Sequence, residues 1–239
     1  MHEFKRILLA AAAALGLPMT EAMCDRFFLY YRLLIEWNEK FNLTSLVDLR
    51  DVVVKHFIDS LTCLLIYNPV AGARLIDIGA GAGFPGLPVK IVCEDLRCTL
   101  IESSAKKAVF LRHVTASLDL ADVEVACGRA EELAHRVCYR ACFDLALARA
   151  VAPLPVLLEY ALPFLKIGGF FIALKGPAVH EELPACGNAL NVLGGSVKEV
   201  KTVFLPITGD MRKLVVVEKT GPTPAKYPRR PGVPQRRPL

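Results

Sequence analysis

The chain has 239 residues, of which 54% are hydrophobic, and its formal net charge is +5. This length suits one large domain, or one domain with a small appendage, and allows a sizeable core. The longest unbroken apolar segment, residues 7–15, is too short to span a bilayer, so we predict no membrane-spanning helix.

Residues 1–19 place Lys5 and Arg6 before that apolar run, a pattern that also occurs in secretory signals. The alanine-rich run equally fits a buried helix ended by Gly16 and Pro18, which is the interpretation we favour. Eight cysteines form no C-x-x-C pair and no metal-binding spacing with the five histidines. We therefore expect reduced, packed thiols in a cytoplasmic protein, and no metal.

Two further helices are predicted before the first strand. Thr20 can cap a helix that runs to about residue 38, with apolar side chains at three- and four-residue spacings. A second helix covers residues 49–65, and a polar turn at 42–45 separates the two. One side of the second helix carries His56, Asp59 and Ser60. Taken alone, such residues are most often caps and surface groups, so their role stays open at this point.

A glycine-rich loop at 77–86, DIGAGAGFPG, follows a short apolar strand and precedes a predicted helix. Glycines remove Cβ atoms where a ligand must approach the backbone, and the helix offers free N–H groups. A dinucleotide-binding G-x-G-x-x-G starting at Gly79 needs glycine at position 84, where Phe84 stands. Asp77 followed by G-x-G-x-G looks instead like the first motif of class I S-adenosylmethionine-dependent methyltransferases. A simple tight turn is the alternative.

Short apolar strands alternate with helical patterns from residue 74 onward, which predicts an α/β fold with a mostly parallel sheet covered by helices on both faces. The predicted strands cover residues 74–76, 98–101, 123–126, 143–147 and 168–174. Helices are predicted at 87–92, 105–117, 153–165 and 181–193, the last with breaks at Pro184 and Gly187. Residues 197–205 and 213–217 predict a closing antiparallel pair.

Four residues follow strands at the edge where such sheets bind their ligands. Glu102, about twenty residues past the glycine loop, is placed to accept hydrogen bonds from a ribose diol. Capping of the next helix is the alternative role for Glu102. Ala130 and Glu131 could flank an adenine or start a helix. Arg149 would lie near the carboxylate of the ligand or near the substrate.

The stretch from Lys219 to Leu239 carries six Lys or Arg residues and no acid, so the rest of the chain is close to neutral. Six prolines argue against a regular helix or central strand, and we expect this tail to lie extended along a surface. Basic side chains suit a polyanion such as RNA, while a solubilising tail is the alternative. The candidate RNA-binding residues are Lys226, Arg229, Arg230, Arg236 and Arg237.

These features divide the chain into a helical amino-terminal segment (1–68), a domain for the cofactor (69–219) and a basic, proline-rich tail (220–239). Seven motifs occur in order along the chain: NLTS at 42–45, HFIDSL at 56–61, GFPG at 83–86, Glu102 with Lys106 and Lys107, RAVAPL at 149–154, LKG at 174–176 and KYPRRPG at 226–232. Together they resemble the bacterial small-subunit ribosomal RNA guanine-N7 methyltransferase family, also called glucose-inhibited division protein B. The match covers nearly the whole chain.

The resemblance implies a class I methyltransferase (Rossmann-like) fold with a seven-stranded sheet and S-adenosylmethionine as cofactor. It implies 16S ribosomal RNA, or a small-subunit particle, as the partner of a monomeric enzyme. The implied cofactor contacts are Gly79, Phe84, Ala130, Glu131 and Arg149, and the general class I pattern adds Asp77, Gly81 and Glu102. Arg149 and Lys175 are expected to position substrate or cofactor, and Asn42, His56 and Asp59 to wall the substrate side.

Two positions depart from the family's usual form: Ala80, where a hydroxyl residue is frequent, and Ala148, where serine often precedes the arginine. Each could remove one hydrogen bond, a net effect of about 1 kcal/mol.

The motifs that are missing also bear on the reaction. Methylation of an exocyclic amine usually requires an N/D-P-P-Y type motif after the fourth strand, and C5 methylation of a pyrimidine requires a cysteine there; position 149 is arginine and neither follows. Guanine N7 has a lone pair and no proton, so an in-line displacement needs positioning and no general base, and we assign none. Two alternatives stay open: a non-catalytic RNA-binding or assembly factor that keeps the fold, and a small-molecule methyltransferase.

Overall fold

The computed structural model describes residues 1–239 as one α/β unit around a seven-stranded sheet of order β3-β2-β1-β4-β5-β7-β6. The first five strands are parallel, and β7 is antiparallel to both neighbours. Their bounds are β1 (Arg74–Ile78), β2 (Arg97–Glu102), β3 (Val123–Cys127), β4 (Phe143–Arg149), β5 (Leu165–Lys175), β6 (Gly195–Phe204) and β7 (Met211–Lys219). The predicted parallel sheet with a closing hairpin is confirmed.

Alternate residues of the central strands face two separate apolar cores. Leu75, Leu145 and Leu147 belong to one core, and Ile76, Ala146 and Ala148 belong to the other. Successive side chains of a strand point to opposite faces. Asp77 of β1 and Arg149 of β4 therefore lie on the same face of two adjacent strands.

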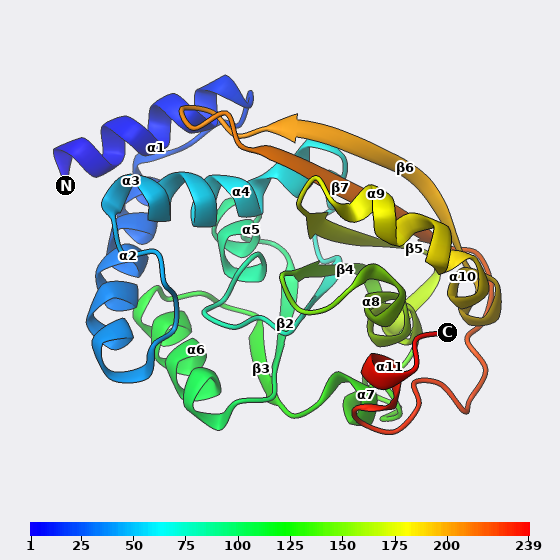
Figure 1. Cartoon of the computed structure of the whole chain (residues 1–239). Coiled ribbons are helices and arrows are strands. Elements are labelled where there is room, and N and C mark those ends of the chain that lie inside the picture. The colour runs from blue at the N-terminus through cyan, green and yellow to red at the C-terminus, as the bar shows by residue number, and fades with distance from the viewer.

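Helices cover both faces of the sheet, as Figure 1 shows. The core that contains Leu75 packs under the amino-terminal helices and the two that follow β1 and β2: α1 (His2–Ala14), α2 (Glu21–Phe41), α3 (Leu49–Asp51), α4 (Asp59–Leu61), α5 (Gly86–Val92) and α6 (Ala105–Ser117). The other core packs under α7 (Ala130–Leu133), α8 (Leu154–Ala161), α9 (Val179–Glu182) and α10 (Gly187–Leu193). Helix α1 buries Phe4, Leu8, Ala11 and Ala12, as expected for an amino-terminal buried helix. No helix combines the length and apolar character needed to cross a membrane.

Two predicted helices change type along their length in the structure. The helix predicted over 49–65 is present over that whole span, but it is not one α-helix: α3 leads into a π-helical segment, η1 (Val52–Ile58), then α4 and a 3-10 turn, η2 (Thr62–Leu65). Apolar spacing cannot separate these helix types, and π-helical turns are frequent at functional sites. The helix predicted over 153–165 ends at Ala161 and continues as a 3-10 turn, η3 (Leu162–Phe164). The breaks predicted within 181–193 are confirmed: η4 (Leu183–Cys186), which contains Pro184, separates α9 from α10, and α10 begins at Gly187.

The tail is packed on the domain, which corrects the expectation of an extended strap without helix. It contains a short helix, α11 (Val233–Arg236), and buries Tyr227, Pro228 and Pro234. Arg140 donates hydrogen bonds to the carbonyls of Thr223, Pro224 and Tyr227 at 2.9, 3.1 and 2.9 Å. Proline at the start of a short helix needs no N–H partner, so the prolines did not preclude this turn.

Candidate functional site

The glycine loop between β1 and α5 combines tight packing with one open position. Gly79, Gly81 and Gly83 have φ values of 71°, 60° and 98°, a region that favours glycine. A Cβ on Gly83 would lie 2.4 Å from the Tyr30 hydroxyl oxygen, and one on Gly79 would lie 2.8 Å from a Val151 methyl. At Gly81 the nearest atom is 3.9 Å away. Of these three glycines, Gly81 alone therefore has no close atom of the chain against its Cβ position.

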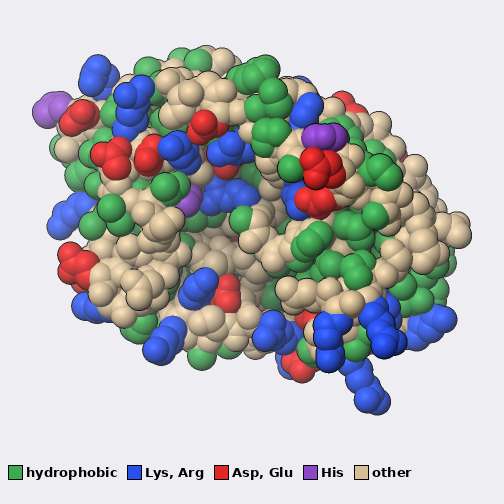
Figure 2. Space-filling view, in the orientation of Figure 1, with side chains coloured by type: hydrophobic (Ala, Val, Ile, Leu, Met, Phe, Trp, Pro, Cys, Tyr) green, Lys and Arg blue, Asp and Glu red, His purple; other side chains and the backbone are tan.

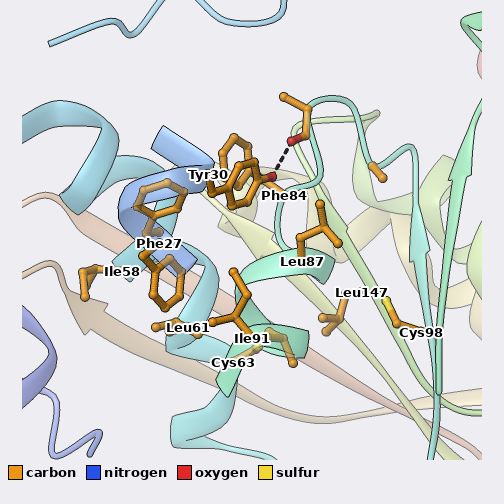
Figure 3. Packing of buried hydrophobic residues seen from close by; sticks show 14 of the residues in the cluster. Phe27, Tyr30, Ile58, Leu61, Cys63, Phe84, Leu87, Ile91, Cys98 and Leu147 are labelled. Atoms are coloured by element: carbon orange, nitrogen blue, oxygen red, sulfur yellow. Dashed lines mark hydrogen bonds between the residues drawn. The ribbon is translucent and has the colours of Figure 1, made fainter. Parts of the chain in front are cut away.

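Phe84 lies between two aromatic rings from the amino-terminal helices. His56 stacks on it at 4.5 Å between ring centres, and Tyr30 stacks at 5.5 Å. Figure 3 shows the Tyr30 and Phe84 rings side by side and the hydrogen bond from the Tyr30 hydroxyl to the Ala82 carbonyl. The amino-terminal helices thus hold the glycine loop directly, a contact that fixes where a ligand would lie.

Two carboxylates shape the same loop. Glu102, at the end of β2, accepts from the Gly81 N–H at 2.9 Å and from the Ser104 N–H at 2.7 Å. Asp77 is fully buried and accepts from the Gly86 N–H at 2.8 Å through Oδ2, while its Oδ1 has no partner. Burial raises the pKa of Asp77 to about 7, although the Gly86 N–H and Arg149 oppose this shift.

Arg149 is held at the end of β4 by the segment around His56. Its Nη1 donates to the Lys55 carbonyl at 3.0 Å and to Asp59 Oδ2 at 3.2 Å, and its Nη2 lies 3.2 Å from His56 Nδ1. Its guanidinium carbon lies 5.0 Å from the centre of the Phe84 ring. Burial lowers the pKa of Arg149, and the Asp59 carboxylate opposes that shift. The Nε–H and one Nη2–H have no acceptor in the chain.

His56 is neutral in this cluster. Burial, reinforced by the charge of Arg149, lowers the pKa of His56 to about 3. A guanidinium can only donate, so His56 Nδ1 accepts from Arg149 and the ring proton lies on Nε2. Nε2 is 2.8 Å from the Thr44 hydroxyl oxygen, which accepts this bond. The two ring nitrogens therefore have fixed and different partners.

Asp59 connects Arg149 to a second arginine that the sequence did not indicate. The side chain of Asp59 is 5% exposed; its Oδ1 lies 3.1 Å from Arg212 Nε, while Oδ2 binds Arg149. Arg212 comes from the start of β7 and has no sequence motif of its own. Tyr30 was likewise indicated only as an apolar position of a helix. The arrangement of β7 and α2 around the site reveals both.

The other substrate-side candidates are spread around the Arg149 cluster. Lys175, at the end of β5, donates to the Ala152 carbonyl at 3.2 Å and pairs with Glu182 at 2.9 Å, so it pins the segment after β4. Asn42 is the exposed, left-handed residue that ends α2, and no hydrogen bond joins its side chain to the cluster. The chain has no group of three or more His, Cys, Asp or Glu side chains arranged to hold a metal ion.

The tail reaches the site through two carboxylates. Glu159 of α8 is fully buried and accepts from Arg229 Nη2 at 2.6 Å and from the Arg229 N–H at 2.7 Å. Glu131 of α7 accepts from the Gly232 N–H at 3.2 Å. Ala130 is buried beside Glu131 in the same short helix. Of the five basic tail candidates, Arg229 therefore has its charge paired within the chain.

The remaining tail cations lie on the surface. Lys226, Arg230, Arg236 and Arg237 are exposed. Figure 2 shows Lys and Arg side chains gathered over the region of α7 and α11. The same view shows a hollow near the middle of this face, with a histidine and cationic side chains at its edge. The cations and the hollow thus share one face of the molecule.

Comparison with known sequences agrees with the motifs. Residues 23–212 match the family model described as rRNA small subunit methyltransferase G. A protein named ribosomal RNA small subunit methyltransferase G from Pelotomaculum thermopropionicum is 48% identical over 95% of both chains. Proteins of the same name from Alkaliphilus metalliredigens and Desulforamulus reducens are 44% and 42% identical over 99% and 100% of both chains.

Solved structures with a similar fold are more distant in sequence. A SAM-dependent methyltransferase from Aquifex aeolicus has a TM-score of 0.53 and 19% identity, over 71% of this chain and 93% of that one. A predicted O-methyltransferase from Agrobacterium tumefaciens has a TM-score of 0.54 and 24% identity, over 68% of this chain and 81% of that one. At these identities the likeness shows the fold alone, which is that of the class I methyltransferases.

Proposed function

Because the chain belongs to the rRNA small subunit methyltransferase G family, we propose that it transfers a methyl group from S-adenosylmethionine to N7 of a guanine in small-subunit (16S) ribosomal RNA. The observation that carries this proposal is the near full-length match to relatives of that name, together with the methyltransferase fold. The site adds a glycine loop with one unobstructed position, Gly81, and the donors of Arg149.

The residues of the glycine loop fit S-adenosylmethionine. A Cβ on Gly81 would meet only the Gly79 carbonyl oxygen, 3.9 Å away, so this position is free for a ligand. Glu102 uses one lone pair of Oε2 on the Gly81 N–H and one lone pair of Oε1 on the Ser104 N–H, and keeps the others for a ribose diol. Ala130 and Glu131 would lie next to the adenine, and Gly79 and Phe84 would contact the cofactor from the glycine loop. Asp77 would support the loop without touching the cofactor, because its carboxylate accepts a hydrogen bond from the Gly86 N–H.

When bound, S-adenosylmethionine supplies an electrophilic methyl group on a sulfonium. The chain's own residues then position the guanine, since N7 carries no proton to remove and positioning can supply most of the acceleration. Arg149 has two N–H groups without acceptors in the chain and offers them to substrate or cofactor. His56 donates to Thr44 and accepts from Arg149, so it orients these groups without acting as a base.

For the RNA we infer an electrostatic contact along the tail. Lys226, Arg230, Arg236 and Arg237 are exposed and can neutralise phosphates, which gives affinity without reading sequence. Arg229 is the exception, because it pairs with Glu159. Asn42 and Lys175 complete the substrate side. We further propose that the enzyme is monomeric, holds no metal and acts on ribosomal RNA in the cytoplasm. We also propose three segments: a helical amino-terminal segment (1–68), a cofactor-binding domain (69–219) and a basic tail (220–239).

Borohydride and aniline treatment cleaves RNA at N7-methylguanosine and so tests the reaction directly. Small-subunit RNA from a strain that lacks this chain should lose one cleavage product, as read by primer extension. Expression of the wild-type chain should restore that product, and Arg149→Ala should restore far less of it. An identical cleavage pattern with and without the chain would show that the proposal is wrong.

A further inference from the structure

The docked tail lies beside a residue of the proposed cofactor site. Arg229 binds the fully buried Glu159 through its backbone N–H, Nε and Nη2 at 2.7, 3.0 and 2.6 Å. Arg229 Nη2 also donates to the Arg237 carbonyl at 2.8 Å, so one guanidinium holds both ends of the segment 229–237. The segment between these contacts includes Gly232 and α11.

Gly232 connects the docked tail to Glu131 by a hydrogen bond. Its φ of 78° is a left-handed conformation that glycine adopts without strain. In this conformation its N–H points at Glu131 Oε1, 3.2 Å away, and no other backbone N–H donates to that carboxylate. Glu131 is 4% exposed, so its carboxylate needs such a partner. The docked tail therefore supplies the one backbone N–H that holds the orientation of Glu131.

Tyr160 supports the same placement from α8. Burial and the neighbouring Glu131 carboxylate raise the pKa of Tyr160 to about 12, which keeps its hydroxyl protonated near the carboxylate. Glu159, the adjacent residue of α8, anchors Arg229. One short helix thus faces both the tail and Glu131.

We propose that the docked tail is a structural part of the cofactor site: Arg229 and Gly232 are positioning residues that hold Glu131, so undocking the tail weakens binding of S-adenosylmethionine even without RNA. This inference rests on the proposed function, in which Glu131 contacts the cofactor. It assigns the tail a second role beside RNA binding and separates the roles by residue. Arg229 and Gly232 support cofactor binding, and the exposed cations Lys226, Arg230, Arg236 and Arg237 bind the RNA.

A double-mutant cycle between Arg229 and Glu131 tests the proposal. Isothermal titration with S-adenosylmethionine in the absence of RNA measures the affinity of the wild type, Arg229→Met, Glu131→Ala and the double variant. We expect each single change to weaken binding about fivefold, the size of one lost oriented hydrogen bond. The double variant should bind no more weakly than Glu131→Ala, since Arg229 affects the cofactor only through the Glu131 carboxylate.

Other outcomes separate the possible failures. If the two losses of cofactor affinity multiply fully in the double variant, Arg229→Met acts by general destabilisation. If Arg229→Met binds the cofactor like the wild type, the tail is not coupled to the site. Either result overturns the inference. Wild-type affinity in Glu131→Ala overturns it as well and leaves the methyltransferase proposal standing. No binding by the wild type would contradict the proposed function itself.

Two further variants serve as a control for distant ion pairs and as a substitute should Arg229→Met not fold. Lys166→Met removes the cation of an ion pair with Asp144 away from the site and should bind the cofactor like the wild type. If Arg229→Met does not fold, Arg229→Lys keeps a charge beside Glu159 but loses the forked contact that also reaches Arg237. Its cofactor affinity should fall less than fivefold, and an unchanged affinity in this folded variant would count against the proposal.

Discussion

Arg149 donates a hydrogen bond to His56, with 3.2 Å between Nη2 and Nδ1, so an arginine next to the proposed cofactor site fixes a neutral histidine. The same arginine binds the Asp59 carboxylate, which in turn binds Arg212. Charge in this cluster is therefore carried by Arg149, Asp59 and Arg212, and the neutral histidine orients Arg149 alone.

The neutral His56 predicts a specific dependence of stability on pH. The pKa of His56 falls from 6.5 to about 3 on folding, so between these values the unfolded chain binds a proton that the folded chain does not. The contribution of His56 is fully present above pH 6.5 and is lost as the pH falls toward 3. Between pH 7 and pH 5 the wild type should lose about 2 kcal/mol more free energy of unfolding than His56→Asn. Urea denaturation at the two pH values measures the difference.

The exposed His180 supplies the control for that experiment. His180→Asn should keep the wild-type dependence on pH. Should His56→Asn keep it too, the ring would be protonated or solvated in the folded protein, contrary to the geometry.

Replacing Asp59 with asparagine should destabilise the fold and stop methyl transfer. The amide keeps the shape but leaves Arg149 and Arg212 without their shared counter-charge in a buried setting. We expect a loss of about 3 kcal/mol in the free energy of unfolding, as for other broken buried ion pairs. Asp51→Asn, which disrupts a solvent-screened pair with Lys55, should cost far less. Equal losses in the two variants would contradict this account.

Tyr30→Phe tests the contact between α2 and the glycine loop. Removing the hydroxyl leaves the buried Ala82 carbonyl without its donor, which should cost about 2 kcal/mol of stability and weaken S-adenosylmethionine binding. The adjacent Tyr31 makes no hydrogen bond through its hydroxyl, so Tyr31→Phe should leave both quantities unchanged. Thermal unfolding and calorimetric titration of the two variants, side by side, decide the matter.

Gly81 and Gly72 form a matched pair for locating the cofactor. Both have left-handed φ values, 60° and 76°, and in both an added Cβ would meet no atom closer than 3.9 Å. Alanine should therefore cost each position about 1 kcal/mol of stability through backbone strain alone. Only Gly81→Ala should also weaken cofactor binding, by about tenfold, the equivalent of 1.4 kcal/mol. Equal cofactor affinities in the two variants would place the ligand elsewhere.

The sequence predicted those features whose causes are local in the chain. Apolar runs alternating with helical patterns predicted the sheet, and the spacing of Gly79, Gly81 and Phe84 predicted the loop. Glu102 was placed correctly at the end of β2, because the edge of a parallel sheet follows from strand order alone.

Features that depend on distant partners were beyond such reasoning. Arg212 and Asp59 are 153 residues apart, and neither has neighbours that indicate the pairing. Glu159 lies within an apolar helix pattern, and its buried charge becomes intelligible only with Arg229 beside it. The π-helical turn before Asp59 likewise has no signature in the spacing of apolar residues.

The buried position of Glu159 has a consequence for how the protein is made. Its cation, Arg229, follows 70 residues later, so α8 is synthesised long before its partner. A nascent chain that has not yet reached Arg229 has this carboxylate and no counter-charge for it. The tail can dock, and Glu131 can receive the Gly232 N–H, only after residues 229–237 have emerged from the ribosome. The cofactor site is therefore completed only after every strand of the sheet has been made.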